Sequence, residues 1–145
     1  MKITICSSAF FVKEVYEIKE KLEEKGHEVF VFPQKVKVGG KLIDVEEYYR
    51  MRKDNLTHDL LKIKTQLMNE HLERIKNSDA ILVLNFDKDG KEGYIGGNTF
   101  LEMGIAYYLG KKIFLWKMPS KNLPYFEEIL ALNPIVVEED IEKIV

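Results

Sequence analysis

Glu102 is the residue whose surroundings best suit chemistry. It is the one charged residue in the segment 96–110, GGNTFLEMGIAYYLG, and two glycines, Gly96 and Gly97, precede it. Glycine lets a loop approach a ligand closely, and the start of a helix offers unpaired N–H groups and a partial positive charge. The rest of the segment is apolar nearly all round, which predicts a largely buried helix. Because a carboxylate is rarely buried without a partner or a task, Glu102 is a candidate nucleophile or ligand-binding group.

A structural role for Glu102 fits the same motif equally well. Thr99-Phe100-Leu101-Glu102 matches a capping box, in which a glutamate at the third helical position bonds back to the backbone at the cap. This interpretation predicts that the helix begins directly after Thr99. It also predicts that loss of the carboxylate mainly destabilises the fold.

Small polar residues after the first predicted strand form a second candidate site. Ser7 and Ser8 stand where many α/β proteins bind phosphate, although both could instead cap the next helix. Cys6 is expected to act as a small buried hydrophobic residue. No arginine precedes Arg50, which excludes a Cys-x5-Arg phosphatase loop. A Walker P-loop and a GxGxxG fingerprint are also absent.

The three histidines, at positions 27, 58 and 71, lack the HxxxH or HxH spacing typical of a metal site, so no metal is expected. His71 should lie in the last turns of a helix, where a solvated or capping role is the simpler interpretation. The charged stretch 44–59 has the composition of solvated helix surface. Tyr48 and Tyr49 within it could instead form a partner contact or a lid over a pocket.

Alternating strands and helices must position these residues. Strands are predicted at 2–6, 29–32, 80–86, 112–116 and 134–137, with a loop or short hairpin-like excursion at 35–41. Helices are predicted at 12–25, within 41–77 with a break near Asn55 or Thr57, and at 96–110, 123–132 and 138–145. This order predicts one domain, 1–145, with a three-layer α/β fold of Rossmann or flavodoxin type around a mostly parallel five-stranded sheet. Its ligand site should lie beyond the carboxyl ends of the strands.

Composition narrows the possible partners and compartment. The chain has 145 residues, of which 46% are hydrophobic and 32% charged, with a net charge of -2. There is no excess of lysine and arginine for a nucleic acid polymer. One cysteine excludes an internal disulfide and favours a reducing compartment. Without a usual signal-peptide segment or a run of ~20 apolar residues, a cytoplasmic protein without a membrane partner is expected.

The sequence resembles the nucleoside 2-deoxyribosyltransferase superfamily, which includes the 2'-deoxynucleoside 5'-phosphate N-hydrolases. The shared features are a first strand ending in small residues and Phe10, the strand DAILVLNF, and G-x-T-x-x-E-x-G-x-A followed by Gly-Lys-Lys. The likeness spans residues 1–116 and leaves 36–64 unmatched. It implies cleavage or transfer at the N-glycosidic bond of a (deoxy)nucleoside or nucleoside 5'-monophosphate. It also implies no metal or organic cofactor, and a homodimer.

The resemblance implies roles for individual residues. Glu102 would attack the anomeric carbon and displace the base, forming a glycosyl-enzyme that water or a second base resolves. His71 takes the place of a family aspartate and would orient the sugar or act as an acid. Phe10 would stack on the base. Phosphate or sugar would be held by Ser7, Ser8, Gly96, Gly97, Asn98 and Thr99. Of these, Gly96 replaces a second family aspartate and offers only its backbone N–H, and Asn98 replaces a glycine.

Two other functions fit the same residues. The segment GGNTFLE is similar to the GGxGTxxE loop of cytokinin-activating phosphoribohydrolases, although it is one residue shorter. That likeness implies ribosyl rather than deoxyribosyl monophosphates as substrates. The absence of the family aspartate at Gly96 would also suit a non-catalytic nucleotide-binding or sensor module.

Overall fold

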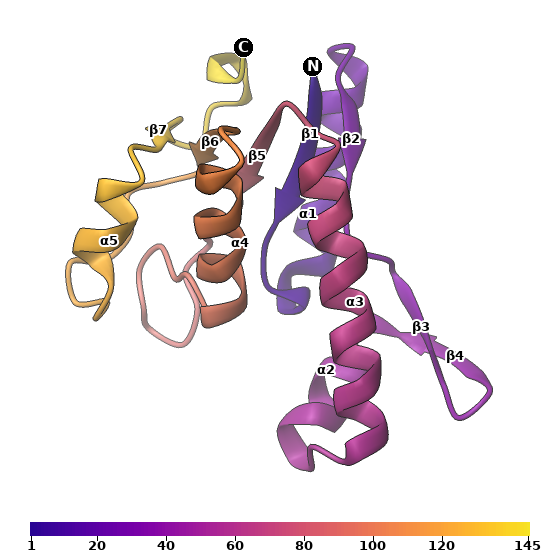
Figure 1. The fold of residues 1–145 in the computed structure, drawn as a ribbon. Coiled ribbons are helices and arrows are strands. Elements are labelled where there is room, and N and C mark those ends of the chain that lie inside the picture. Colours follow the sequence, from indigo (N-terminus) through magenta and orange to yellow (C-terminus); the bar gives the residue numbers. More distant parts are fainter.

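The computed structural model describes all residues, 1–145, and contains a five-stranded parallel sheet between two layers of helices (Figure 1). Its strands are β1 (Lys2–Cys6), β2 (Glu28–Phe30), β5 (Ala80–Val83), β6 (Lys112–Leu115) and β7 (Ile135–Val136). They lie in the order β2-β1-β5-β6-β7. The α/β fold class predicted from the sequence is confirmed. The strand order reverses between β1 and β5, which is where such sheets bind ligands.

The helices cover both faces of the sheet. They are α1 (Val12–Glu24), α2 (Val45–Asp54), α3 (His58–Lys76), α4 (Gly97–Tyr108) and α5 (Phe126–Ala131), with short 3-10 turns η1 (Ala9–Phe11) and η2 (Ile141–Lys143). On one face, α1 packs against Ile3, Ile5 and Leu82. On the other, α4 and α5 pack against Ile81 and Val83. Alternate residues of the buried strands thus serve two separate cores. None of the helices combines the length and apolar character needed to cross a bilayer.

A hairpin separates β2 from the helices that follow. β3 (Lys35–Val38) and β4 (Lys41–Asp44) pair antiparallel around Gly39 and Gly40, whose φ angles are 57° and 81°. Two consecutive positive φ angles suit a tight two-residue turn that glycine forms without strain. The hairpin excursion was expected, but it extends through residues 41–44, where a helix was predicted. The break before α3 agrees with the prediction, since the Thr57 hydroxyl accepts the Leu60 N–H at 3.2 Å.

The last residues differ from the sequence prediction. A helix over 138–145 is wrong, because only the short turn η2 forms there. Glu138 and Glu139 have positive φ angles of 55° and 63°. The N–H of Val137 donates to the carbonyl of Leu115, and that of Glu139 to Trp116. Pairing along the end of β6 therefore replaces the hydrogen bonds that a helix would have made.

Helix α4 is less buried than its composition predicts. Met103 and Ala106 are buried beneath it, but Leu101 and Leu109 are exposed and Tyr108 has an exposed fraction of 87%. Leu101 and Tyr108 are seven residues apart and therefore share a face of the helix. This face points away from the sheet. The prediction that the helix is buried on nearly all sides is therefore wrong.

Candidate active site

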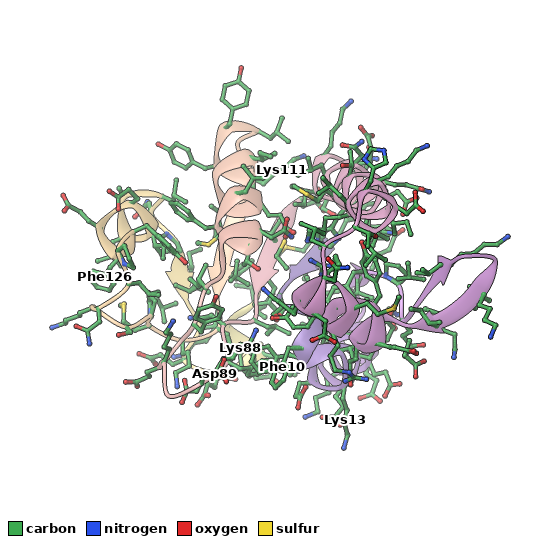
Figure 2. All side chains as sticks on the ribbon, turned by 90° about the horizontal axis from the view of Figure 1, so that it is seen from below. Phe10, Lys13, Lys88, Asp89, Lys111 and Phe126 are labelled. Carbon is green, nitrogen blue, oxygen red and sulfur yellow. The ribbon has the colours of Figure 1, made fainter.

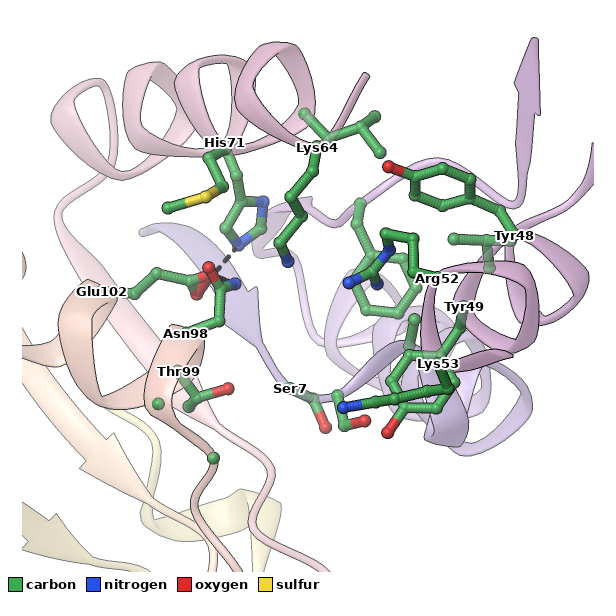
Figure 3. Close-up of a pocket in the computed structure, with 18 of the residues that line it drawn as sticks. Ser7, Tyr48, Tyr49, Arg52, Lys53, Lys64, His71, Asn98, Thr99 and Glu102 are labelled. Carbon is green, nitrogen blue, oxygen red and sulfur yellow. Dashed lines mark hydrogen bonds and ion pairs between the residues drawn. The ribbon is translucent and has the colours of Figure 1, made fainter. Parts of the chain in front are cut away.

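A cavity of about 220 Å³ lies beyond the carboxyl ends of β1 and β5, between α4 on one side and α2 and α3 on the other (Figure 3). It is the crevice that the strand order predicts. The predicted site residues that line it are Ser7, Ser8, His71, Gly96, Gly97, Asn98, Thr99 and Glu102. They come from the loop after β1, from α3 and from the start of α4, so the fold brings together groups that lie up to 95 positions apart in the chain.

The carboxylate of Glu102 is held in place through one oxygen only. Its side chain is 7% exposed, and the Asn98 amide donates to Oε1 at 2.8 Å. The second oxygen, Oε2, has no hydrogen-bond partner and lies 3.6 Å from His71 Nε2. A buried carboxylate oxygen without a partner costs free energy in the folded chain. Such an atom is available for a bond to a ligand.

Burial raises the pKa of Glu102 from 4.5 to about 7. The Cys6 thiol and the Lys64 and Asn98 side chains act in the opposite direction, because each favours the ionised form. At neutral pH both forms of the carboxyl are therefore well populated. A carboxyl group with a pKa near the working pH can act in its charged form at one step of a reaction and in its neutral form at another.

The capping-box interpretation of Glu102 is wrong for this helix. α4 begins at Gly97 with Gly96 as its cap, so Glu102 lies in the second turn and its carboxylate meets Asn98 instead of the cap backbone. The first helical bond runs from the Phe100 N–H to the Gly96 carbonyl. The N–H groups of residues 97–99 lie before this first bond and therefore have no partner within the helix, as at any helix start.

His71 is buried on the inner face of α3 and is neutral near pH 7. Burial lowers its pKa to about 4, and the positive charges of Arg74 and Lys64 act in the same direction. Arg74 Nη1 lies 3.3 Å from His71 Nδ1. Because a guanidinium has no acceptor, Nδ1 must accept this bond and the ring proton resides on Nε2. The ring therefore presents an N–H toward Glu102. The simpler sequence interpretation, a solvated or capping histidine, is wrong.

Cys6 is fully buried, as expected, but it also belongs to the site. Its Sγ lies 3.7 Å from His71 Nε2, and burial and the nearby Glu102 carboxylate raise the pKa of the thiol well above its ordinary value. Each of Cys6, His71 and Glu102 offers one atom that could bind a metal: the Sγ, a ring nitrogen and a carboxylate oxygen. These three atoms lie within 4.8 Å of one another. These three residues are the ones that could hold a metal ion. Histidine spacing could not reveal this group, because each member comes from a different element.

Ser7, Ser8 and Thr99 line the cavity, and the two serine hydroxyls also form hydrogen bonds with the backbone. Ser7 Oγ donates to the Leu84 carbonyl at 2.8 Å, which ties the loop after β1 to the end of β5. Ser8 caps the turn η1 by accepting the Phe10 N–H at 3.2 Å, so the capping alternative holds for this residue. Both hydroxyls line the cavity all the same. Thr99 is buried in the first turn of α4.

Phe10 is not among the residues that line the cavity. Its ring is 54% exposed and packs edge-on against Phe11. Lys88, which does line the cavity, lies over this ring with Nζ 5.1 Å from the centroid, and Figure 2 shows the two labelled side by side. The aromatic rings inside the lining are those of Tyr48, Tyr49 and Tyr94, with Phe32.

The cationic side chains of the cavity were not predicted from the sequence. Arg52, Lys53, Lys64 and Lys88 all line it, the first two from α2. The stretch 44–59 was interpreted as solvated surface because charged residues on a helix usually face water. Tyr48 and Tyr49 were the available signal, since a lid over a pocket was the alternative interpretation of these residues. Both tyrosines line the cavity.

Neither a family model nor a curated protein matches the chain. Among solved structures, a 2-deoxyribosyltransferase of Bacillus psychrosaccharolyticus aligns with a TM-score of 0.52 and 19% identity, covering 94% of this chain and 98% of that one. A CMP N-glycosidase of Clostridium botulinum aligns with a TM-score of 0.49 and 20% identity, over 99% and 95% of the two chains. The first alignment shows that the chain shares the fold of a 2-deoxyribosyltransferase, and the resemblance predicted from the sequence is confirmed at that level.

Proposed function

We propose that this chain cleaves or transfers at the N-glycosidic bond of a (deoxy)nucleoside or nucleoside 5'-monophosphate, with Glu102 as the nucleophile. The observation that supports this most strongly is the state of the Glu102 carboxylate. It is the only carboxylate among the cavity-lining residues, it is anchored through Oε1, and its Oε2 has no hydrogen-bond partner. The fold shared with a 2-deoxyribosyltransferase agrees with this chemistry.

In the first step, an oxygen of ionised Glu102 forms a bond to the anomeric carbon of the sugar. The bond from that carbon to the base nitrogen breaks, and its electron pair leaves with the base, which takes a proton from solvent water. The transition state resembles an oxocarbenium ion, which the negative carboxylate stabilises. Water or a second base then attacks the same carbon and releases the Glu102 carboxylate.

His71 would position the reacting groups. With its proton on Nε2 and 3.6 Å from the carboxylate, a neutral imidazole can donate a hydrogen bond to Glu102 or to a sugar hydroxyl. Its pKa of about 4 leaves little imidazolium at neutral pH, so an orienting role suits it better than that of a proton donor. Tyr94, which lines the cavity, is better placed than Phe10 to stack on the base.

A panel of nucleosides and nucleotides tests the proposed reaction. Deoxyribosyl and ribosyl nucleosides and their 5'-monophosphates are incubated with the wild type at high concentration, and free base is measured by chromatography. Glu102→Gln should abolish base release. Glu73→Gln, a change at an exposed position of α3, is the matched control and should retain release.

The same panel separates the alternatives. Release from ribosyl monophosphates alone would indicate a phosphoribohydrolase. No release from any compound, together with ligand-induced stabilisation of the fold, would indicate a binding or sensor module and would contradict the proposed chemistry.

A further inference from the structure

The cavity has a positive charge balance that the chain as a whole lacks. The full sequence has a net charge of -2, yet the cavity lining contains four cationic side chains and a single carboxylate. The four are Arg52, Lys53, Lys64 and Lys88. None of them takes part in an ion pair, although other lysines and arginines of the chain form seven such pairs with carboxylates.

Aromatic rings of α2 hold Arg52 and Lys53 toward the cavity. The Arg52 guanidinium carbon lies 4.9 Å from the centroid of the Tyr48 ring and 5.5 Å from that of Tyr49. Lys53 Nζ lies 5.2 Å from the Tyr49 ring centroid. Tyr48 is itself buried and fixed by a 2.7 Å hydrogen bond from its hydroxyl to the Leu60 carbonyl. Stacking on an anchored ring fixes the orientation of a guanidinium but leaves its N–H groups free to bind a ligand.

The positive charges of Arg52, Lys53 and Lys64 also lie close enough to repel one another. Burial lowers the pKa of Lys64, and the positive charges of Arg52 and Lys53 lower it further, against the opposite effect of Glu102. Arg52 Nε is buried and has no hydrogen-bond partner. Like charges that face one another and a buried donor without an acceptor both cost free energy in the folded chain. A bound anion with several acceptor oxygens would relieve both costs.

Lys88 has a different environment from the other three. Its Nζ donates to the Tyr49 hydroxyl at 2.7 Å and lies 4.9 Å from the centroid of the same ring. It therefore has an acceptor within the chain. Its contact joins the loop after β5 to α2, so it is better suited to hold these two segments together than to bind an anion.

We propose that Arg52, Lys53 and Lys64 bind the phosphate of a nucleoside 5'-monophosphate whose glycosidic carbon faces Glu102. Figure 3 shows the three cations reaching into the cavity from α2 and α3, opposite Glu102 and Asn98. A nucleoside monophosphate matches this arrangement, with a dianion at one end of the sugar and the electrophilic carbon at the other. A planar guanidinium can bind two phosphate oxygens at once, which favours phosphate over a neutral hydroxymethyl group. This inference rests on the proposed function.

The first test compares rates for a monophosphate and for the corresponding nucleoside. The wild type should prefer the monophosphate in kcat/KM. Arg52→Gln should reduce this preference by roughly 10- to 100-fold, the effect of a lost hydrogen bond to a charged group. Arg50→Gln is the control, because Arg50 is exposed on the same helix and does not line the cavity. Lys64→Met should act like Arg52→Gln, with the exposed Lys62→Met as its control.

The second test measures binding without turnover. In a Glu102→Gln background, calorimetry should show tighter binding of the monophosphate than of the nucleoside, and Arg52→Gln should weaken it by a similar factor. Inorganic phosphate should compete with the monophosphate.

The outcomes distinguish failure of this inference from failure of the proposed function. Base release that is equal for nucleoside and monophosphate, and unchanged in Arg52→Gln and Lys64→Met, would overturn the phosphate site alone. Arg52-dependent binding of the monophosphate without any base release would overturn the reaction and leave the phosphate site. Tighter binding of a di- or triphosphate than of the monophosphate would contradict the choice of ligand.

Discussion

Replacing Glu102 by glutamine should make the protein more stable at high pH and leave its stability nearly unchanged at low pH. The free carboxyl has a pKa of 4.5, and burial raises that of Glu102 to about 7 in the folded chain. The stabilising contribution of the protonated form is therefore complete below pH 4.5 and is lost as the pH rises through 7. Glutamine resembles the protonated carboxyl in shape and cannot ionise, so it escapes this loss.

The size of the effect follows from the two pKa values. One pKa unit corresponds to about 1.4 kcal/mol, so ionising Glu102 inside the fold costs ~3 kcal/mol at pH 8 and above. The facing groups do not remove this difference, because Cys6 stays a thiol and His71 stays neutral across that range in both proteins. For a chain of this length, a gain of that size corresponds to a melting temperature roughly 6–12 °C higher.

The assay is urea unfolding followed by circular dichroism, in half-unit steps from pH 4 to pH 9, for the wild type, Glu102→Gln and the exposed control Glu73→Gln. The difference in unfolding free energy between wild type and Glu102→Gln should grow from pH 4.5 to about 7 and stay level at higher pH, while the control shows no such trend. A Glu102→Gln protein that is less stable than the wild type by a constant amount at every pH would contradict this prediction. It would mean that the ionised carboxylate is a well-satisfied structural group.

Four further results are expected. kcat/KM should rise with pH and level off above about 7, as the nucleophile Glu102 ionises; a profile that falls over this range would assign it the role of an acid. Arg74→Gln should lower kcat by roughly 10-fold, because His71 loses the partner that fixes its Nε2 proton, and nitrogen NMR should show mixed tautomers. Treatment with EDTA should leave base release unchanged, since the proposed steps need no metal. A loss of activity that zinc restores would show that Cys6, His71 and Glu102 form a metal centre. The chain is expected to form a homodimer through the exposed apolar face of α4, so light scattering should show a monomer for Tyr108→Asp; an unchanged mass of two chains would exclude that face.

The sheet could be predicted from the sequence because its strands are short, apolar and bounded by turn residues. The apolar run at 80–83 occupies the central position that its composition indicates, and the strand order explains why residues near Ser7 and Glu102 meet. The helix break at Thr57 also follows from a local rule of capping. These features depend on neighbouring residues in the chain.

The missed features depend on tertiary contacts. The cations of α2 face the cavity because the hairpin β3–β4 and Tyr48 place this helix over the strand ends, which no periodicity in 44–59 discloses. The contact of Cys6 with His71 joins two elements separated by most of the chain's first half. The extended backbone after Val137 follows from hydrogen bonds to the end of β6 rather than from the helical propensity of its own residues.

In the proposed function, the Glu102 carboxylate performs the chemistry. The most direct measurement is the release of free base from a deoxynucleoside 5'-monophosphate at pH 8, where the carboxylate is ionised, by wild type and Glu102→Gln. We predict release by the wild type and a loss of at least roughly 1,000-fold in the variant, as expected when a nucleophile is removed. Equal release by the two proteins would contradict the account.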